Sequence, residues 1–402
     1  MTRELLVVAV EASADLHGAA VLRELRALRP GLRAFGAGGP LLRAEGCETL
    51  VRAEDLSVMG IAEVLPALTR IFRALRTLRR AAEERRPAAA LLIDSPDFNL
   101  RLARKLRARG VPVAYFIGPS VWAWRTYRVK QIARDVARML VILPFEAAFY
   151  SRHGVRAVYV GNPLADRLRL PTSTSTSTST STSTSTSTST STSTSMPRAT
   201  IRRSLGLDPS RRVLALLPGS RRQEIRRLWP PLLGAARLLL GRHPDLQLIV
   251  PVAPTVRREW LPTDVLISFV DGRAPDVLAA CDAAIVASGT ATLEAALAQV
   301  PLVVVYRMSW LSWLIGKLLV RVPFVSLVNL MAGRALVPEL LQRDCTSGAI
   351  AGRVAGLLEP GAERDAQLDG LRRIRAELAP AGASGAARRA AEEIAALLGD
   401  AA

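Results

Sequence analysis

One aspartate, Asp94, has a type and position suited to acid–base chemistry. It directly follows the apolar run 88–93, which predicts a buried strand, so Asp94 stands at the carboxyl end of that strand. A carboxylate there could accept a proton from a substrate hydroxyl. The alternative is a helix cap formed by Asp94 or Asp97. We expect Asp97 to cap the next helix, the following proline to keep Ser95 extended, and Asp94 to act chemically.

Two other loops in the first half of the chain also follow predicted strands. Glu11, Ser13 and Asp15 come after the first apolar run, where small residues and helix-terminal N–H groups could contact a substrate. A helix cap by Ser13 or Asp15 is the competing interpretation. Trp122 and Trp124 lie two residues apart in the second loop and could line a site for an acyl chain or a sugar. Buried packing is the alternative for one of them.

In the second half, a turn suited to phosphate follows the apolar run 213–217. Gly219 and Ser220 form the turn, and Arg221 comes at the start of a predicted helix. Backbone N–H groups and the helix dipole would face an anion there, and the guanidinium could bind it with two hydrogen bonds. The turn lacks the GK[ST] sequence of a Walker A loop. A solvated arginine at a helix start is the alternative.

A second turn of the same kind follows the apolar run 283–287. Ser288, Gly289 and Thr290 open the next predicted helix, and Glu294 lies one helical turn further on the same face. Glu294 could therefore reach a ribose beside a phosphate at the helix tip. An ordinary capped helix is the alternative, but two anion-suited turns in one domain favour nucleotide binding.

The alternation of apolar runs with helical segments is typical of parallel α/β architecture. We expect strands at 4–10, 88–93, 113–117, 139–143, 157–160, 213–217, 246–252, 265–269, 283–287 and 301–305. The stretch Phe35 to Pro40 reads as a turn after a strand-like segment, and helices are expected at 222–240, 274–281 and 290–299. Two doubly wound domains facing across a cleft would place ligands at the carboxyl ends of these strands.

A low-complexity tract of twelve Thr-Ser pairs, residues 172–195, separates the two halves. It has no apolar side chain to bury, so we expect it to be disordered and dispensable. The predicted organisation is a first domain over 1–165, a linker over 166–200 and a second, nucleotide-binding domain over 201–402. The last helices could pack back on the first domain.

Charge and cysteine content limit the classes of partner. Lys+Arg 54 and Asp+Glu 35 give a net charge of +19, nearly all of it from arginine. The three cysteines and three histidines are scattered without ligand spacing, so we expect no metal site, no disulfide and no cofactor. No uncharged run approaches 18 residues, which argues against a membrane span. The sequence has no nucleic-acid-binding signature either.

An arginine-rimmed apolar stripe at residues 59–80 could lie on an anionic membrane surface, and an ordinary amphipathic surface helix explains it as well. The predicted membrane-facing residues are Met59, Ile61, Val64, Leu68, Arg70, Phe72 and Arg73.

Taken together, the motifs resemble the lipid-A-disaccharide synthase family across essentially the whole chain apart from the Thr-Ser tract. The stretches that carry the resemblance are Glu11-Ala-Ser-Ala-Asp-Leu, Met59-Gly-Ile-Ala-Glu-Val-Leu, Asp94-Ser-Pro-Asp-Phe-Asn, Pro119-Ser-Val-Trp-Ala-Trp, Leu143-Pro-Phe-Glu, Leu217-Pro-Gly-Ser-Arg, Ala287-Ser-Gly-Thr-Ala-Thr-Leu-Glu, Asn329-Leu-Met-Ala-Gly-Arg and Pro338-Glu-Leu-Leu-Gln. The chain departs from the family pattern at Val10, Ala14, Asn162 and Val328.

The resemblance implies a two-domain glycosyltransferase fold of the B type (GT-B). It implies UDP-2,3-diacylglucosamine as donor, 2,3-diacylglucosamine 1-phosphate (lipid X) as acceptor, and peripheral attachment to the cytoplasmic face of the inner membrane. It also implies that the domain over 1–165 is the acceptor-side, membrane-facing domain and that the domain over 201–402 binds the UDP-sugar. The family's essential aspartate and arginine correspond to Asp94 and Arg221, and Asn329 joins the UDP-binding residues. A homodimer is compatible with this. The alternatives are another UDP-sugar transferase or epimerase on the same fold, or a membrane-surface binding protein with impaired catalysis.

Overall fold

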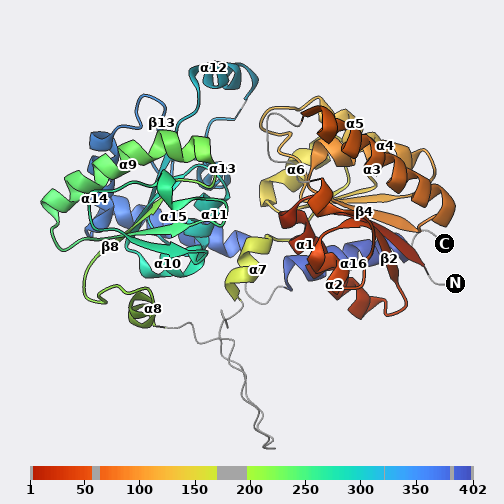
Figure 1. Ribbon diagram of the computed structural model, residues 1–402, viewed down its shortest axis with the longest axis horizontal. Helices are drawn as coiled ribbons and strands as arrows, with labels where there is room; N and C mark the ends of the chain where they lie inside the picture. Colours follow the sequence, from red (N-terminus) through yellow and green to blue (C-terminus); the bar gives the residue numbers. More distant parts are fainter. Residues whose placement is uncertain (1–2, 57–63, 170–196, 321, 381–383, 400–402) are drawn as a thin grey trace, which may run out of the picture. The chain divides into compact units, whose positions relative to one another are not determined.

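A computed structural model describes residues 3–56, 64–169, 197–320, 322–380 and 384–399 (Figure 1). The chain divides into two compact units. Unit 1 comprises Met1–Pro163, Lys317–Val322 and Leu378–Ala402, and unit 2 comprises Leu164–Gly316 and Pro323–Glu377. The Thr-Ser tract lies outside the described residues, as do Met59 and Ile61.

Unit 1 is built on a seven-stranded parallel sheet with the order β3-β2-β1-β4-β5-β6-β7. The strands are β1 (Glu4–Val8), β2 (Arg33–Gly38), β3 (Glu48–Arg52), β4 (Ala89–Ile93), β5 (Val113–Phe116), β6 (Arg138–Val141) and β7 (Ala157–Tyr159). All five strands predicted for this half are present, whereas β2 and β3 were not among the predicted strands.

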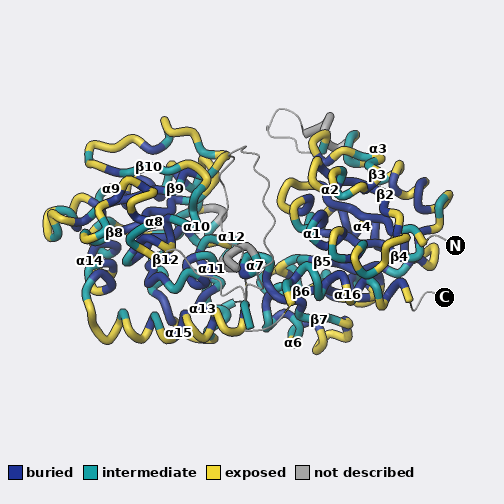
Figure 2. The backbone as a smooth tube through the Cα atoms, turned by 90° about the horizontal axis from the view of Figure 1, so that it is seen from below, coloured by how far each residue is buried: buried dark blue, intermediate teal, exposed yellow. Residues whose placement is uncertain are grey.

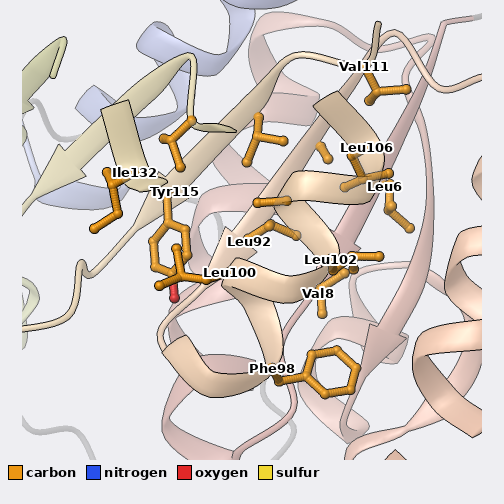
Figure 3. Close-up of a cluster of buried hydrophobic side chains, with 14 of the residues drawn as sticks. Leu6, Val8, Leu92, Phe98, Leu100, Leu102, Leu106, Val111, Tyr115 and Ile132 are labelled. Carbon is orange, nitrogen blue, oxygen red and sulfur yellow. The ribbon is translucent and has the colours of Figure 1, made fainter. Parts of the chain in front are cut away.

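Helices cover both faces of this sheet, because successive strand residues point to opposite sides. Leu6 and Val8 face one apolar core, and Leu5 and Val7 face another. Figure 3 shows the first core, where side chains of α4 pack against the strands. The helices are α1 (Ala12–Leu28), α2 (Pro40–Ala44), α3 (Val64–Arg85), α4 (Pro96–Arg107), α5 (Arg128–Asp135), α6 (Pro144–Arg152) and α16 (Ala386–Gly399), with the 3₁₀ turn η1 (Ala53–Asp55). Helix α16 packs on α1 and contributes to the second core.

The predicted turn at Phe35 to Pro40 is wrong, because β2 continues through Gly38. Gly36 has φ +148°, and a Cβ there would lie 2.0 Å from the carbonyl oxygen of Val7 on β1. Gly36 therefore allows the backbones of β1 and β2 to approach closely within the sheet. In the sequence, a glycine with this role looks the same as a glycine in a turn.

Unit 2 has a six-stranded parallel sheet with the order β10-β9-β8-β11-β12-β13. The strands are β8 (Val213–Leu217), β9 (Gln247–Val252), β10 (Ser268–Asp271), β11 (Ala283–Ala287), β12 (Leu302–Tyr306) and β13 (Glu339–Leu341). The predictions for β8 and β11 match residue for residue. Strand β10 begins at Ser268 rather than at 265, and β13 was not predicted.

Helices again cover both faces of the unit 2 sheet. Helices α9 and α14 pack together over an apolar core, and α10 and α11 contact the strands from the other face. The helices beginning in this part of the chain are α7 (Pro163–Arg169), α8 (Arg198–Ser204), α9 (Arg222–Arg242), α10 (Ala274–Ala280), α11 (Thr290–Leu297), α12 (Trp310–Leu319), α13 (Leu327–Ala332), α14 (Ser347–Leu358) and α15 (Ala362–Leu378), with the 3₁₀ turn η3 (Arg258–Trp260). Figure 2 shows the central strands of each sheet in the dark blue of buried residues, whereas β3 and β10, at the sheet edges, are partly exposed.

In each sheet the strand order reverses at one point, on either side of which the chain adds strands toward opposite edges. Ligands of open α/β sheets bind at such a switch point. In unit 1 the reversal lies between β1 and β4, and in unit 2 it lies between β8 and β11. We therefore expect ligands at the four loops that follow β1, β4, β8 and β11. In the described part of the chain, no helix is long and apolar enough to cross a membrane.

Candidate active site

In unit 1, the loops after β1 and β4 are tied together by side chains. Ser95 Oγ donates a hydrogen bond of 2.7 Å to Glu11 Oε1. Glu11 and Ser95 are separated by 84 residues in sequence, but β1 and β4 are neighbours in the sheet. The fold thus brings the predicted site residue Glu11 to the turn that contains Asp94.

The turn at Asp94 and Ser95 has an unusual backbone. Both residues are left-handed, with φ of +51° and +43°, and neither is glycine. The Asp94 carbonyl oxygen accepts hydrogen bonds from the Tyr115 hydroxyl at 2.6 Å and from Asn99 Nδ2 at 2.8 Å. Such conformations cost on the order of 1–3 kcal/mol per residue and persist where the surroundings over-determine them, typically at functional sites.

This geometry corrects two expectations. Ser95 is left-handed rather than extended, because the hydrogen bonds to Glu11 and at the Asp94 carbonyl outweigh the local preference set by the next proline. Asp97 does not cap α4, since its carboxylate pairs with Arg128 and Arg125 instead.

The protonation behaviour of Asp94 suits a base. Burial raises the pKa of the Asp94 carboxyl above its usual range, a hydrogen bond from the Ser95 backbone opposes the shift, and the charge of Glu11 adds to it. A carboxylate with a raised pKa is a stronger proton acceptor, and it is still ionised once the pH exceeds that value.

The remaining loop residues after β1 have different surroundings. Ser13 is exposed in the first turn of α1. Asp15 is buried, and its carboxylate accepts backbone N–H groups of Gly39, Leu41 and Leu42 at 2.7 to 3.1 Å. Asp15 therefore caps α2, not α1. Its oxygens are committed to the backbone, so the structure does not support Asp15 as a substrate contact.

The loop after β5 carries the two tryptophans. Trp124 is exposed, and the Arg125 guanidinium stacks on its ring at 3.9 Å. Trp122 is half-buried, contacts Phe145 edge-on at 5.0 Å between ring centroids, and donates Nε1–H to the Glu146 carboxylate. Both indoles thus lie in a loop at the carboxyl edge of the sheet, next to the β4 loop that carries Asp94.

In unit 2, the turn after β8 exposes a guanidinium. The Arg221 side chain is 83% exposed. Gly219 has φ +103°, and a Cβ there would come within 2.5 Å of the Glu224 carboxylate. That carboxylate accepts the N–H groups of Ser220 and Arg221 at 3.2 and 3.3 Å. The predicted open cradle of N–H groups is therefore partly occupied by Glu224. The Arg221 guanidinium also donates to this carboxylate, at 3.2 Å to Oε1, although most of the side chain faces solvent.

The turn after β11 is open. Gly289 has φ +150° and ψ −160°, a region almost restricted to glycine, and a Cβ there would meet nothing within 4 Å. Thr290 is exposed at the start of α11, and Ser288 Oγ donates to the Val325 carbonyl oxygen at 3.1 Å. The Ser288 N–H donates to the Val305 carbonyl oxygen at 3.0 Å and the Thr292 N–H to the Gly289 carbonyl oxygen at 3.1 Å, so Ser288 does not offer its amide as predicted. The N–H groups of Gly289 and Thr290 are the ones at this helix start that are suited to an anion.

Glu294 lines a small hollow of about 120 Å³ between α10 and α11. The other lining residues are Leu164, Gly272, Ala274, Pro275, Leu278 and Ala298. Glu294 is thus one turn from the helix tip, beside a space rather than inside the core.

Comparison with known proteins identifies the family. The family profile described as lipid-A-disaccharide synthetase matches residues 5–184 and 188–394. The lipid-A-disaccharide synthases of Anaeromyxobacter dehalogenans (strain 2CP-C) and Myxococcus xanthus (strain DK1622) are 50% and 49% identical to the chain over 400 and 399 residues, which is 98% of this chain and 97% of each relative. The chain belongs to the lipid-A-disaccharide synthase family. It is therefore a glycosyltransferase of lipid A biosynthesis.

Solved structures confirm the predicted GT-B fold. The calicheamicin glycosyltransferase CalG4 superposes with a TM-score of 0.59 at 17% identity, over 99% of this chain and 98% of that one. A UDP-GlcNAc 2-epimerase from Neisseria meningitidis, bound to UDP-GlcNAc, superposes with a TM-score of 0.58 at 12% identity, over 99% of this chain and all of that one. At these identities the likeness concerns the fold alone.

Within this family member, Asn329 has a structural task. It is 1% exposed; its amide nitrogen donates to Val337 and Glu339, and its amide oxygen accepts the N–H groups of Leu336 and Val337. All its hydrogen-bonding capacity is used inside the loop before β13. The structure therefore does not support Asn329 as a direct UDP ligand, and it holds the loop instead.

The predicted membrane-facing residues that are described lie on α3. Phe72 is 56% exposed, Arg73 is exposed and Arg70 is half-buried. Val64 and Leu68 belong to α3, but their side chains lie outside the described residues.

Sequence reasoning missed three polar residues that hold the site. Tyr115 and Asn99 fix the Asp94 carbonyl, and Glu146 binds the Trp122 indole. Asn99 and Glu146 stood inside quoted family stretches, but nothing in their spacing showed what they touch. Tyr115 lies within an apolar strand and gives no signal beyond its hydroxyl.

Proposed function

We propose that this chain transfers 2,3-diacylglucosamine from UDP-2,3-diacylglucosamine to the 6-hydroxyl of 2,3-diacylglucosamine 1-phosphate (lipid X). The products are the β-1,6-linked disaccharide 1-phosphate and UDP. Family membership over the full length supports this reaction. The single observation that carries the proposal in this chain is the partly buried carboxylate of Asp94 at the switch point of unit 1, on a left-handed backbone whose carbonyl group is held by Tyr115 and Asn99.

Asp94 is the proposed general base. Its carboxylate takes the proton of the acceptor 6-hydroxyl while that oxygen forms a bond to the anomeric carbon of the donor. The bond from this carbon to the UDP oxygen breaks on the opposite face, so the configuration inverts. A positioned general base contributes about 10²–10⁴-fold to such a rate.

The switch point of unit 2 is the proposed diphosphate site. The exposed guanidinium of Arg221 and the N–H groups of Gly289 and Thr290 would oppose the charge of the diphosphate. Phosphate oxygens would compete with Glu224 for the N–H groups of Ser220 and Arg221. Glu294 would accept hydrogen bonds from ribose hydroxyls. No DxD sequence is present to hold a divalent ion, which favours metal-independent transfer.

We also propose peripheral attachment to the anionic cytoplasmic face of the inner membrane, where both lipid substrates would reside. An exposed aromatic ring, Phe72, beside the exposed Arg73 on α3 fits an interfacial helix. Liposomes with and without anionic lipid would test this, and equal binding to both would contradict it.

The test of the reaction is UDP release from purified protein given each substrate separately and both together. We expect release only with both lipids, and turnover that survives EDTA. Consumption of UDP-N-acetylglucosamine while the diacylated donor is ignored would contradict the substrate assignment. Liposome binding without any UDP release would indicate a binding protein that has lost catalysis.

A further inference from the structure

Helix α6 forms hydrogen bonds at two points with the loop after β5, the loop that carries Trp122 and Trp124 (here the tryptophan loop). Glu146, in the first turn of α6, accepts the Trp122 Nε1–H at 3.0 Å through Oε1. Tyr150, one turn further on, donates its hydroxyl to the Pro119 carbonyl oxygen at 3.0 Å. The loop is therefore held by two side chains from one helix, and one of these bonds reaches a candidate substrate residue.

The loop has little room to adjust between these points. Ile117 is left-handed with φ +60°, which is rare for a β-branched residue. A Cβ on Gly118 would lie 3.0 Å from the Met139 sulfur and 3.1 Å from the Tyr150 oxygen. Phe145, also on α6, packs edge-on against the Trp122 ring. The indole is thus fixed by a hydrogen bond at its nitrogen and by a ring contact.

Burial of the Glu146 carboxylate costs more desolvation free energy than a helix start requires. It is 3% exposed, and its second oxygen, Oε2, accepts the Leu143 N–H at 3.1 Å. Two donors therefore converge on the two oxygens, an arrangement that suits a carboxylate and not an amide, whose nitrogen cannot accept. Burial raises the pKa of Glu146 to about 7, although the bonds from Trp122 and from the Leu143 and Ile142 backbone oppose the shift.

The neighbouring groups leave Glu146 as the group that changes charge near neutrality. Tyr150 is the titratable side chain recorded next to it, and burial and the Glu146 charge both raise the pKa of the phenol well above neutrality. Trp122 and the backbone N–H groups do not titrate.

We propose that Glu146 is a positioning residue that holds Trp122 in the orientation in which its indole contacts the acylated sugar acceptor. The inference rests on the proposed function, because Trp122 contacts a substrate only if the acceptor binds in unit 1. Glu146 itself touches no reacting atom. The ionised carboxylate gives a charge-assisted hydrogen bond to the indole, and protonation weakens it.

The activity test is a double-mutant cycle between Glu146→Gln and Trp122→Phe, with acceptor KM and kcat measured from pH 5.5 to 8.5. We expect Glu146→Gln to raise the acceptor KM about 5- to 10-fold at pH 8 while kcat changes less than about twofold. In the wild type the acceptor KM should fall as pH rises through about 7, and in Glu146→Gln this step should vanish. Adding Glu146→Gln to Trp122→Phe should cause no further loss.

Tyr150→Phe is the matched control, because it removes the other bond from α6 to the same loop. It should leave the pH midpoint of acceptor KM in place. A purely structural role for Glu146 predicts the same loss in the Trp122→Phe background as in the wild type. That result, or a pH step that persists in Glu146→Gln, would overturn the proposal.

Tryptophan fluorescence separates this inference from the proposed function, because it needs no substrate. Wild-type protein should show a fluorescence change centred near pH 7 that is absent from both Glu146→Gln and Trp122→Phe. An inactive wild type would contradict the proposed function, and the fluorescence step would still decide whether Glu146 holds Trp122. A step that remains in Trp122→Phe would overturn the inference even if Glu146→Gln fails to fold.

Discussion

The two switch-point sites share a topology but differ in how their functional groups are held. In unit 1 the polar groups around Asp94 are buried or bonded to one another, and the backbone is left-handed at two consecutive residues. In unit 2 the side chain of Arg221 is 83% exposed, and a Cβ on Gly289 would meet nothing within 4 Å. The groups of the unit 1 site are held by several hydrogen bonds from different elements, whereas those of the unit 2 site are exposed and are bonded mainly to Glu224, which a ligand could displace.

This difference matches two different chemical tasks. A general base must hold one oxygen in a fixed direction with a tuned pKa, which requires burial and several anchors. A diphosphate is large, strongly charged and recognised by many donors, so an open turn with a mobile arginine suffices. The comparison predicts that a change at Asp94 acts on the rate of chemistry and that changes at the two turns of unit 2 act on UDP affinity.

The largest effect is expected from Asp94→Asn. The variant keeps the shape of the side chain but cannot accept the proton, so kcat should fall by about 10³-fold with KM for both substrates nearly unchanged. Wild-type kcat should rise with pH through the raised pKa of Asp94, and this limb should disappear from the residual rate of the variant. Steady-state UDP release across pH measures both.

Asp97→Asn is the matched control, because Asp97 lies three residues away and pairs with Arg128 on the surface. It should keep most of the wild-type rate. Equal losses from the two substitutions would mean that the fold of the loop, and not the Asp94 carboxylate, accounts for the effect.

Arg221→Ala should have the next largest effect. Charge-assisted hydrogen bonds are worth about 1.5–3 kcal/mol, so the donor KM should rise about 10- to 100-fold while acceptor KM stays constant. Arg237→Ala, which removes an exposed guanidinium paired with Asp264 in the same unit, serves as control. A donor KM that rises equally in both variants would point to general charge rather than to the turn.

Substitutions of two glycines, one in each unit, test the difference between the units with smaller expected effects. Gly36→Ala should destabilise the protein by about 2–4 kcal/mol, because its Cβ would clash with the Val7 carbonyl oxygen, while UDP affinity of the folded protein stays the same. Gly289→Ala meets no clash, so it should cost only about 1–2 kcal/mol of stability through its backbone conformation but weaken UDP binding about 10-fold. Denaturant unfolding and UDP titration compare the two, and the reverse pattern would contradict the assignment.

The last prediction concerns the pH dependence of stability, which does not involve the reaction itself. Folding raises the pKa of Glu146 from 4.5 to about 7, so the native state binds an extra proton between these values and stability falls as pH rises from about 5 to above 7. The full shift corresponds to roughly 3 kcal/mol. In Glu146→Gln this loss should be absent, as measured by urea unfolding at pH 5 and pH 8. An unchanged pH dependence in the variant would show that Glu146 does not titrate in this range.

Much of the fold followed from local sequence, because apolar runs bounded by polar residues mark buried parallel strands. Strands β8 and β11 match their predictions residue for residue. The sequence did not predict strand β2, since Gly36 serves a backbone contact with β1 that no local pattern reveals. Three-residue β13 is too short to show periodicity.

The candidate site was predictable in position but less so in detail. Asp94 and Arg221 follow strands, and the carboxyl ends of strands next to a switch point are where ligands bind. Asp15 and Asn329 looked equally polar in sequence, but their partners are backbone groups supplied by the folded chain. The left-handed Ser95 likewise depends on Glu11, a residue 84 positions away. Tertiary hydrogen bonds decide these cases, and single-sequence patterns do not contain them.

The most direct test of the division between the two sites is calorimetric titration of UDP into wild type, Asp94→Asn and Arg221→Ala. We predict that Asp94→Asn binds UDP with the wild-type Kd although its turnover is lost, and that Arg221→Ala binds UDP about 10- to 100-fold more weakly. If Asp94→Asn weakened UDP binding as much as Arg221→Ala, the assignment of chemistry to unit 1 and of diphosphate binding to unit 2 would be contradicted.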